Sequence, residues 1–232
     1  MNLRLFLRIL QAYESWLTRA YLAVRYSIIR WILVDLLANL PDRGVVLNLG
    51  SGIGLFDIYA AHHRPDLRFI GIDLDPRRVR MAAVAARRFG VTNVEFVHGD
   101  VGAALPELDP AVVITLDVLH HLDPPAQDRV LRWVATHLRG DGIFFIKDIS
   151  THTPWKVTFT RVLDDLMTGR EPTYYFAAEQ MRTRLAALGF VTTTFHLWDY
   201  IPFPHIIYVA HKRPGAQPPP TPGAAHAEPR TS

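Results

Sequence analysis

The stretch VVLNLGSGIG, residues 45–54, decides the fold of this chain of 232 residues. Its first half is a short apolar run rich in valine and leucine, which predicts a buried β-strand. Glycines follow at once at positions 50, 52 and 54, and an apolar helical stretch begins near Leu55. Glycine lets the chain turn sharply from strand to helix and lets a ligand approach the backbone closely. A βαβ unit therefore begins here.

Outward from this turn, β-rich runs alternate with helical stretches, which is the pattern of a parallel sheet covered by helices. After the strand at 45–49, strands are expected at residues 67–73, 93–100, 111–117, 142–148, 191–198 and 205–212, and helices at 76–89, 124–138, 155–167 and 177–188. The last two strands are close enough in sequence to form an antiparallel pair. The sequence thus predicts an α/β fold with a doubly wound, mostly parallel seven-stranded sheet and an antiparallel last strand.

Residues 1–40 precede this pattern and are expected to form an amphipathic helical cap, continuous or interrupted. Apolar positions recur there at helical spacing, and Pro41 supplies a stop. Charged residues break the apolar stretch, so no transmembrane segment is predicted. Two interpretations stay open: a cap packed on the domain with its arginines in water, or an interfacial segment that rests on a membrane or admits a lipophilic substrate.

Composition limits the remaining choices. With 49% hydrophobic residues, one full core is expected, in a domain spanning 41–212. Residues 213–232 are rich in proline, alanine and glycine and are expected to form a disordered tail. The absence of cysteine excludes disulfides and a cysteine nucleophile and fits a cytoplasmic protein. The net charge of +3 is not gathered into a dense run, which argues against nucleic acid as the main partner.

Two aspartates end the strands that follow the glycine-rich turn. Asp73 ends the neighbouring strand, so its carboxylate can accept hydrogen bonds from both hydroxyls of a ribose. Asp100 ends the next expected strand, at residues 93–100, where its carboxylate can accept a hydrogen bond from an adenine amino group. Either residue alone would be explained as a helix N-cap. Together with backbone amides at a helix N-terminus, which favour a carboxylate, they predict a site for a nucleoside with an amino-acid end.

The ordered set LNLGSGIG, GIDLDP, HGD and LDVLHHL resembles the class I S-adenosylmethionine-dependent methyltransferase family over roughly residues 45–148. The resemblance implies a Rossmann-like fold and S-adenosyl-L-methionine as cofactor. It implies contacts from Gly50, Ser51, Gly52 and Gly54 to the methionine part, from Asp73 to the ribose and from Asp100 and Val101 to the adenine, with Leu74 also in the cofactor-binding set.

Asn48 departs from the family, which usually has an acidic residue at this position. The amide of Asn48 can still accept a hydrogen bond, but it supplies no charge to hold the ammonium group of the cofactor. We therefore expect either a reduced affinity or compensation by another carboxylate, such as Asp117.

A nicotinamide dehydrogenase is the nearest competitor, because Asp73 also lies at a suitable distance beyond the glycines for that fingerprint. The dinucleotide motif GxGxxG would need glycine where Leu55 stands, and Asp100 would have no role. No GxxxxGK[ST] motif occurs, which argues against a nucleoside triphosphatase. The adjacent histidines at 62–63 and 120–121 lack the spacing of a zinc site, so no metal is predicted.

The chemistry implied by the resemblance is an in-line displacement, in which much of the catalysis comes from positioning the nucleophile. A base is needed only for an acidic acceptor. His121, just beyond the fourth strand, is the first candidate, because histidine titrates in a useful range. Asp148, at the end of the fifth strand, is the second, as base or as orienting partner, with Lys147, His152 and His205 behind it. The alternative is that His121 only packs the loop beside the cofactor.

The acceptor has to be inferred from segments outside the cofactor site. The apolar residues 1–40 and an aromatic-rich stretch suggest an apolar pocket for the acceptor. That stretch contains Trp155, Phe159, Tyr174, Tyr175 and Phe176. We expect a small lipophilic acceptor, such as a quinone precursor, a polyketide-type phenol or a lipid, methylated on oxygen or carbon near the inner face of a membrane.

Two other classes stay open. A methyltransferase acting on RNA or protein is disfavoured by the modest charge and by the lack of an NPPY-like motif after the fourth strand. A non-catalytic protein that binds the cofactor is conceivable because of Asn48. The sequence predicts no oligomeric state.

Overall fold

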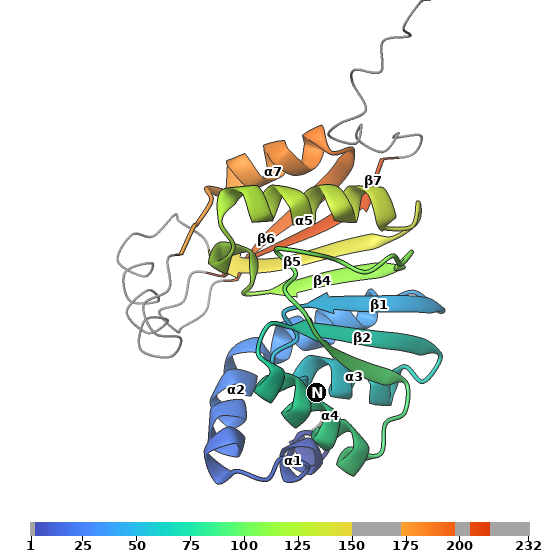
Figure 1. Cartoon of the computed structure of the whole chain (residues 1–232), viewed down its shortest axis with the longest axis vertical. Coiled ribbons are helices and arrows are strands. Elements are labelled where there is room, and N and C mark those ends of the chain that lie inside the picture. The colour runs from blue at the N-terminus through green and yellow to red at the C-terminus, as the bar shows by residue number, and fades with distance from the viewer. Residues whose placement is uncertain (1–2, 150–172, 198–204, 214–232) are drawn as a thin grey trace, which may run out of the picture.

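A computed structural model describes residues 3–149, 173–197 and 205–213. Seven strands form one sheet in the order β3-β2-β1-β4-β5-β7-β6 (Figure 1). They are β1 (Gly44–Leu49), β2 (Leu67–Asp73), β3 (Val94–His98), β4 (Val112–Leu116), β5 (Ile143–Ile149), β6 (Phe190–Leu197) and β7 (His205–Lys212). The first five strands pair in parallel, and β7 is antiparallel to both β5 and β6. The predicted Rossmann-like, doubly wound sheet is confirmed.

Helices cover both faces of this sheet (Figure 1). They are α1 (Leu3–Gln11), α2 (Trp16–Ala38), α3 (Leu55–His63), α4 (Pro76–Phe89), the 3-10 helix η1 (Leu119–His121), α5 (Pro124–His137) and α7 (Ala178–Ala187). One apolar core joins helices α1 to α4 to the sheet, and a second joins α5 and α7 to the other face. This two-sided covering explains why the central strands are apolar on both faces.

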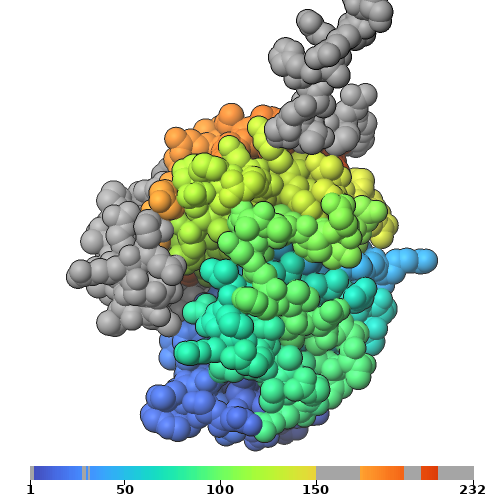
Figure 2. All heavy atoms as spheres, in the orientation of Figure 1, coloured from blue at the N-terminus to red at the C-terminus, as the bar shows by residue number. Residues whose placement is uncertain are grey.

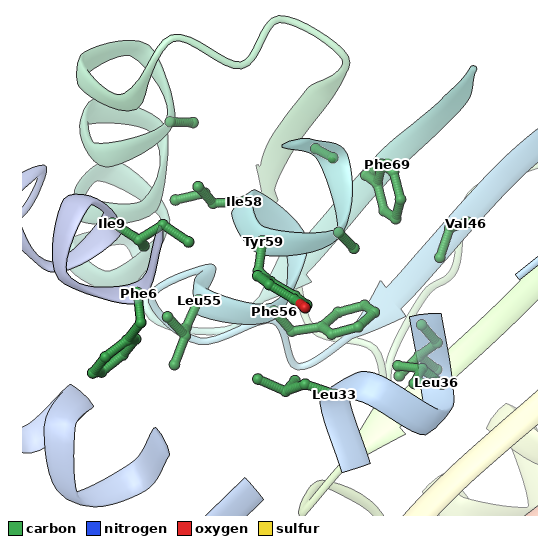
Figure 3. Packing of buried hydrophobic residues seen from close by; sticks show 14 of the residues in the cluster. Phe6, Ile9, Leu33, Leu36, Val46, Leu55, Phe56, Ile58, Tyr59 and Phe69 are labelled. Atoms are coloured by element: carbon green, nitrogen blue, oxygen red, sulfur yellow. The ribbon is translucent and has the colours of Figure 1, made fainter. Parts of the chain in front are cut away.

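The N-terminal segment is two helices. Ser15 is the N-cap residue of α2, and its hydroxyl accepts a hydrogen bond from the amide of Thr18 (3.4 Å). Apolar residues of both helices are buried against α3 and the sheet (Figure 3). The labelled members of this cluster are Phe6, Ile9, Leu33, Leu36, Val46, Leu55, Phe56, Ile58, Tyr59 and Phe69. Helices α1 and α2 therefore contribute one side of the first core.

The surface view shows the N-terminal helices, in blue, at the lower end of the molecule (Figure 2). Glu14, between α1 and α2, forms a surface ion pair with Arg88 of α4 (2.5 Å). In the described part of the chain, no helix combines the length and apolar character needed to cross a bilayer.

Some predicted features lie outside the described residues. These are the helix at 155–167, His152, Trp155, Phe159 and residues 214–232 of the predicted tail.

Candidate functional site

The glycine-rich turn lies at the carboxyl edge of the sheet, between β1 and α3. Gly50, Gly52 and Gly54 have φ of +77°, +58° and +78°, a region that side chains other than glycine rarely adopt. A Cβ at Gly50 would lie 2.2 Å from Val118, and one at Gly54 would lie 2.5 Å from Phe96. A Cβ at Gly52 would meet nothing within 4 Å. The turn is therefore packed against the protein at its two ends and open in its middle.

Asp73, at the end of β2, holds the open part of this turn. Its Oδ2 accepts a hydrogen bond from the amide of Gly52 (2.7 Å), and its Oδ1 accepts one from the amide of Asp75 (3.0 Å). The carbonyl of Ile72 accepts from the amides of Gly50 (2.7 Å) and Ser51 (2.9 Å). The end of β2 thus fixes the turn through backbone and side chain together, so a ligand at Asp73 would also lie beside Gly52.

The end of β3 brings the second predicted carboxylate to the same edge. Asp73 is in register with His98, and the amide of Gly99 donates to the carbonyl of Asp73 (3.1 Å). Asp100 is exposed and accepts a hydrogen bond from the amide of Gly102 (2.8 Å). Val101 is buried, whereas Leu74 is exposed. The predicted nucleoside residues therefore share one edge, with apolar side chains beside the carboxylates.

Asn48 lies on β1, directly beneath the turn, and has an unexpected partner. Its Nδ2 donates to both carboxylate oxygens of Asp57, at 3.1 and 2.9 Å. Asp57 belongs to α3 and is fully buried, with 0% of its surface exposed. Burial raises the pKa of Asp57 to about 7, although the hydrogen bonds from Asn48 act to lower it. This carboxylate was not among the residues predicted from the sequence; the signal for it is a single aspartate within the apolar stretch LFDIYAA.

A second group of charges lies at the ends of β4 and β5. Lys147 is 2% exposed, and its Nζ lies 2.5 and 2.6 Å from the carboxylate oxygens of Asp117. Arg25 of α2 approaches the same carboxylate at 3.7 Å. Burial acts to raise the pKa of Asp117, but the charges of Lys147, His205 and Arg25 outweigh it and hold the pKa below its usual range. Asp117 therefore already has cationic partners.

Asp148, the predicted partner of the candidate base His121, contacts the neighbouring histidine instead. His120, which is buried, donates a hydrogen bond through its Nδ1–H to Asp148 Oδ1 (2.5 Å), so Asp148 orients His120 rather than His121. The ring of His121 lies 4.2 Å from that of His120. Burial, and then the charge of His120, lower the pKa of His121 to about 4. The Nδ1 of His121 has no hydrogen-bond partner among the described residues.

Taken together, the structure gathers the predicted residues into two neighbouring groups. The first group contains Asn48, Gly50, Ser51, Gly52, Gly54, Asp73, Leu74, Asp100 and Val101, and the second group contains Asp117, His121, Lys147, Asp148 and His205. His205 is buried at the start of β7, opposite Ile149. Within the described residues no three potential ligands converge as a metal site. The absence of a metal stays a prediction.

The first group fits an adenosyl amino-acid ligand. The space beside Gly52 is open, and the Oδ1 of Asn48 and the Oγ of Ser51 are buried without a hydrogen-bond partner among the described residues. Buried polar atoms normally have partners, so these two atoms indicate a place where ligand groups would complete the hydrogen bonding.

Comparisons with known proteins agree with this geometry. Residues 46–142 match the family model described as "Methyltransferase domain". The chain is 31% identical over 116 residues to carboxy-S-adenosyl-L-methionine synthase of Nautilia profundicola, which covers 50% of this chain and 49% of that protein. It is 38% identical over 88 residues to release factor glutamine methyltransferase of Mycobacterium leprae, covering 37% and 28%. The chain thus spans about half or less of these curated relatives.

Solved structures share the fold. One is 1,6-didemethyltoxoflavin-N1-methyltransferase of Burkholderia thailandensis, solved with S-adenosylhomocysteine (TM-score 0.61, 22% identity, 80% of this chain and 78% of that one). Another is magnesium protoporphyrin IX methyltransferase of Synechocystis, also with S-adenosylhomocysteine (TM-score 0.60, 22% identity, 84% of each chain). Residues 46–142 of this chain therefore resemble a methyltransferase domain, and the described strands and helices share the fold of these solved structures.

Proposed function

We propose that the protein is an active methyltransferase that transfers a methyl group from S-adenosylmethionine to a small lipophilic acceptor. The observation that carries the cofactor part is the open middle of the glycine-rich turn, held by Asp73 beneath it. When bound, S-adenosylmethionine supplies an electrophilic methyl group. The work of the protein is then to hold this group and the acceptor in line and to exclude water.

Individual residues take roles that follow from their places. Asp73 binds the ribose and fixes the turn, while Asp100 binds the adenine. His121 belongs to the second group, and its lowered pKa keeps it neutral at physiological pH. A neutral imidazole can take a proton from a hydroxyl or an activated carbon as the methyl group is transferred. We assign His121 this role for an acidic acceptor.

The acceptor proposal is supported by the N-terminal helices. Arg25 brings α2 to Asp117 at the carboxyl edge of the sheet, so α2 flanks the second group. The same helices leave large apolar side chains in water, and Trp16 is 73% exposed. The others are Leu3, Leu7, Leu17, Tyr21 and Val24. Apolar side chains beside arginines suit contact with a membrane surface or with a lipophilic molecule.

The enzymatic proposal is tested by titration and by turnover. Isothermal titration with S-adenosylhomocysteine should show one site, and incubation with methyl-labelled S-adenosylmethionine should label the lipid-soluble fraction of a cell extract. Lack of binding would refute the cofactor site, whereas binding without label in any fraction would favour a non-catalytic protein.

Protein or RNA as acceptor is the second candidate, since the relatives include release factor glutamine methyltransferases and a ribosomal RNA methyltransferase. Parallel incubations with crude protein and RNA fractions distinguish it. Label in either fraction, with none in lipid, would replace the lipophilic acceptor.

Membrane contact is tested by co-sedimentation with phosphatidylcholine vesicles containing phosphatidylglycerol. Deleting residues 1–40 would remove part of the core, so point substitutions serve better. Trp16→Ser with Leu17→Ser should reduce binding, whereas Val191→Ser, an exposed apolar position on β6, is the matched control. Equal binding by the wild type and both variants would refute contact through these helices.

A further inference from the structure

Asp57 stands out as a buried carboxylate without a cationic partner. It lies in the first turn of α3, directly after the glycine-rich turn, and its whole surface is buried. Among the described residues, its carboxylate accepts hydrogen bonds from the side chain of Asn48 and from its own backbone amide, and no basic side chain forms an ion pair with it. A buried carboxylate is unfavourable unless it is paired, and an apolar residue would fill this position on the helix better. Its presence therefore calls for an explanation.

The geometry of Asn48 supplies one. Its amide nitrogen is fully engaged by the two oxygens of Asp57, which fixes the orientation of the amide group. The carbonyl oxygen, Oδ1, is thereby left buried and without a hydrogen-bond partner among the described residues. Asp57 thus orients Asn48 so that an acceptor atom, backed by a carboxylate, is available next to the turn that begins at Gly50.

We propose that Asp57 supplies, through Asn48, the negative charge that attracts the ammonium group of the cofactor's amino-acid part. This inference rests on the proposed function. Asp57 is a positioning residue in this arrangement, because Asn48 stands between it and the ligand. The negative charge that Asn48 lacks on β1 is carried instead by Asp57 on α3.

Asp117 is less suited to this task. Its carboxylate already lies within 2.6 Å of Lys147 Nζ and 3.7 Å of Arg25 Nη2, so its charge is balanced within the protein. Asp57 has no such balance. A ligand cation near the turn would therefore gain more from Asp57 than from Asp117.

Two ligands separate this charge effect from a general structural effect. S-adenosylhomocysteine carries the amino-acid part, whereas 5′-methylthioadenosine has the same adenosyl thioether without it. Asp57→Asn keeps the size of the side chain and removes the charge. We expect it to weaken binding of S-adenosylhomocysteine about tenfold or more and to leave that of 5′-methylthioadenosine within about twofold. Equal effects on both ligands, or none, would overturn the proposal.

Relocating the charge gives a second test. The double variant Asn48→Asp with Asp57→Asn moves the carboxylate to β1 and keeps one amide and one carboxylate in contact. It should regain most of the selectivity for S-adenosylhomocysteine that Asp57→Asn loses. A double variant that folds, by circular dichroism, but stays as unselective as Asp57→Asn would count against a charge effect.

The wild-type protein provides a measurement that needs no variant. Because burial raises the pKa of Asp57 to about 7, the ratio of the two affinities should rise between pH 6 and pH 8 in favour of S-adenosylhomocysteine. Tyr13, which packs near Asp57, has a pKa raised by burial and then by Asp57, so it stays protonated in this range. A constant ratio would overturn the proposal. If the wild-type protein bound neither ligand, the cofactor site itself would be refuted instead.

Discussion

Tyr13 and Ile53 are 40 positions apart, yet the hydroxyl of Tyr13 donates a 2.8 Å hydrogen bond to the carbonyl of Ile53. Tyr13 lies between α1 and α2 and is buried, whereas Ile53 lies within the glycine-rich turn. The N-terminal segment therefore supports the glycine-rich turn directly, and Arg25 links α2 to the second group of charges as well.

Tyr13→Phe tests this link. The variant leaves the carbonyl of Ile53 without its donor, so we expect a loss of about 1 kcal/mol in the free energy of unfolding. Binding of S-adenosylhomocysteine should weaken a few-fold because the turn is less firmly held. Urea unfolding and isothermal titration measure the two effects. Tyr21→Phe, which removes only an exposed hydrogen bond from Arg25 to the Tyr21 hydroxyl (3.2 Å), is the control for loss of a surface hydroxyl, and an equal loss in both variants would contradict the link.

Asp73 holds the glycine-rich turn and is proposed to bind the ribose, and substitutions can separate these two tasks. Asp73→Asn keeps an acceptor for the amide of Gly52 but removes the charge, whereas Asp73→Ala removes both. We expect Asp73→Ala to weaken binding of S-adenosylhomocysteine by about 1.5 to 3 kcal/mol, the range for hydrogen bonds to charged groups. Asp73→Asn should fall between this variant and the wild type. Unchanged affinity in Asp73→Ala, measured by titration, would refute the ribose assignment.

The Lys147–Asp117 pair predicts a stability difference. Removing one partner of a fully buried pair costs about 3 to 5 kcal/mol. The side chain of Asp117 is 23% exposed and keeps Arg25 nearby, so Lys147→Met should cost less, about 2 to 3 kcal/mol. The double variant with Asp117→Asn should recover part of this loss. Denaturant unfolding measures both, and a double variant less stable than Lys147→Met would contradict the pairing.

Asp57 predicts how stability changes with pH. Its pKa is about 7 in the folded protein and near 3.8 in the unfolded chain, so the folded state holds a proton that the unfolded state releases between these values. The stabilisation is complete below about pH 4 and is lost as the pH rises through 7. It amounts to roughly 4 kcal/mol, at about 1.4 kcal/mol per pKa unit. Compared with Asp57→Asn, the wild type should therefore lose stability between about pH 4 and pH 7 in urea unfolding.

The two adjacent histidines should respond differently to substitution. His121→Ala should lower the methyl-transfer rate for an acidic acceptor by about 10² to 10⁴ and leave binding of S-adenosylhomocysteine unchanged. Its pKa of about 4 predicts a rate that is flat from pH 6 to pH 8. His120→Gln should instead lower stability, because it breaks the contact with the buried Asp148. An unchanged rate in His121→Ala would remove that residue from catalysis.

The sequence was sufficient to predict the sheet and the glycine-rich turn, because both depend on local patterns. Strand β1 reads as an apolar run, and glycines at positions 50 and 54 are required by contacts that any Cβ would violate. The expected antiparallel end of the sheet is confirmed by β7.

The partnerships within the site could not be predicted in this way. Asp57 on α3 contacts Asn48 on β1. Asp148 contacts His120 and not His121 because of the way η1 is oriented after β4. Such contacts are set by three-dimensional packing, to which the spacing of residues in the sequence gives no direct guide. The approach of Arg25 on α2 to Asp117 could not be predicted for the same reason.

The position of β7 between β5 and β6 has a consequence for how the chain is made. In the described sheet, β6 is hydrogen-bonded to β7 alone, although it is synthesised first. On the ribosome, β6 therefore cannot form its hydrogen bonds to the sheet until residues 205–212 have emerged and paired with β5. His205 reaches the carboxyl edge in the same event, so β7 completes both the described sheet and the second group of charges.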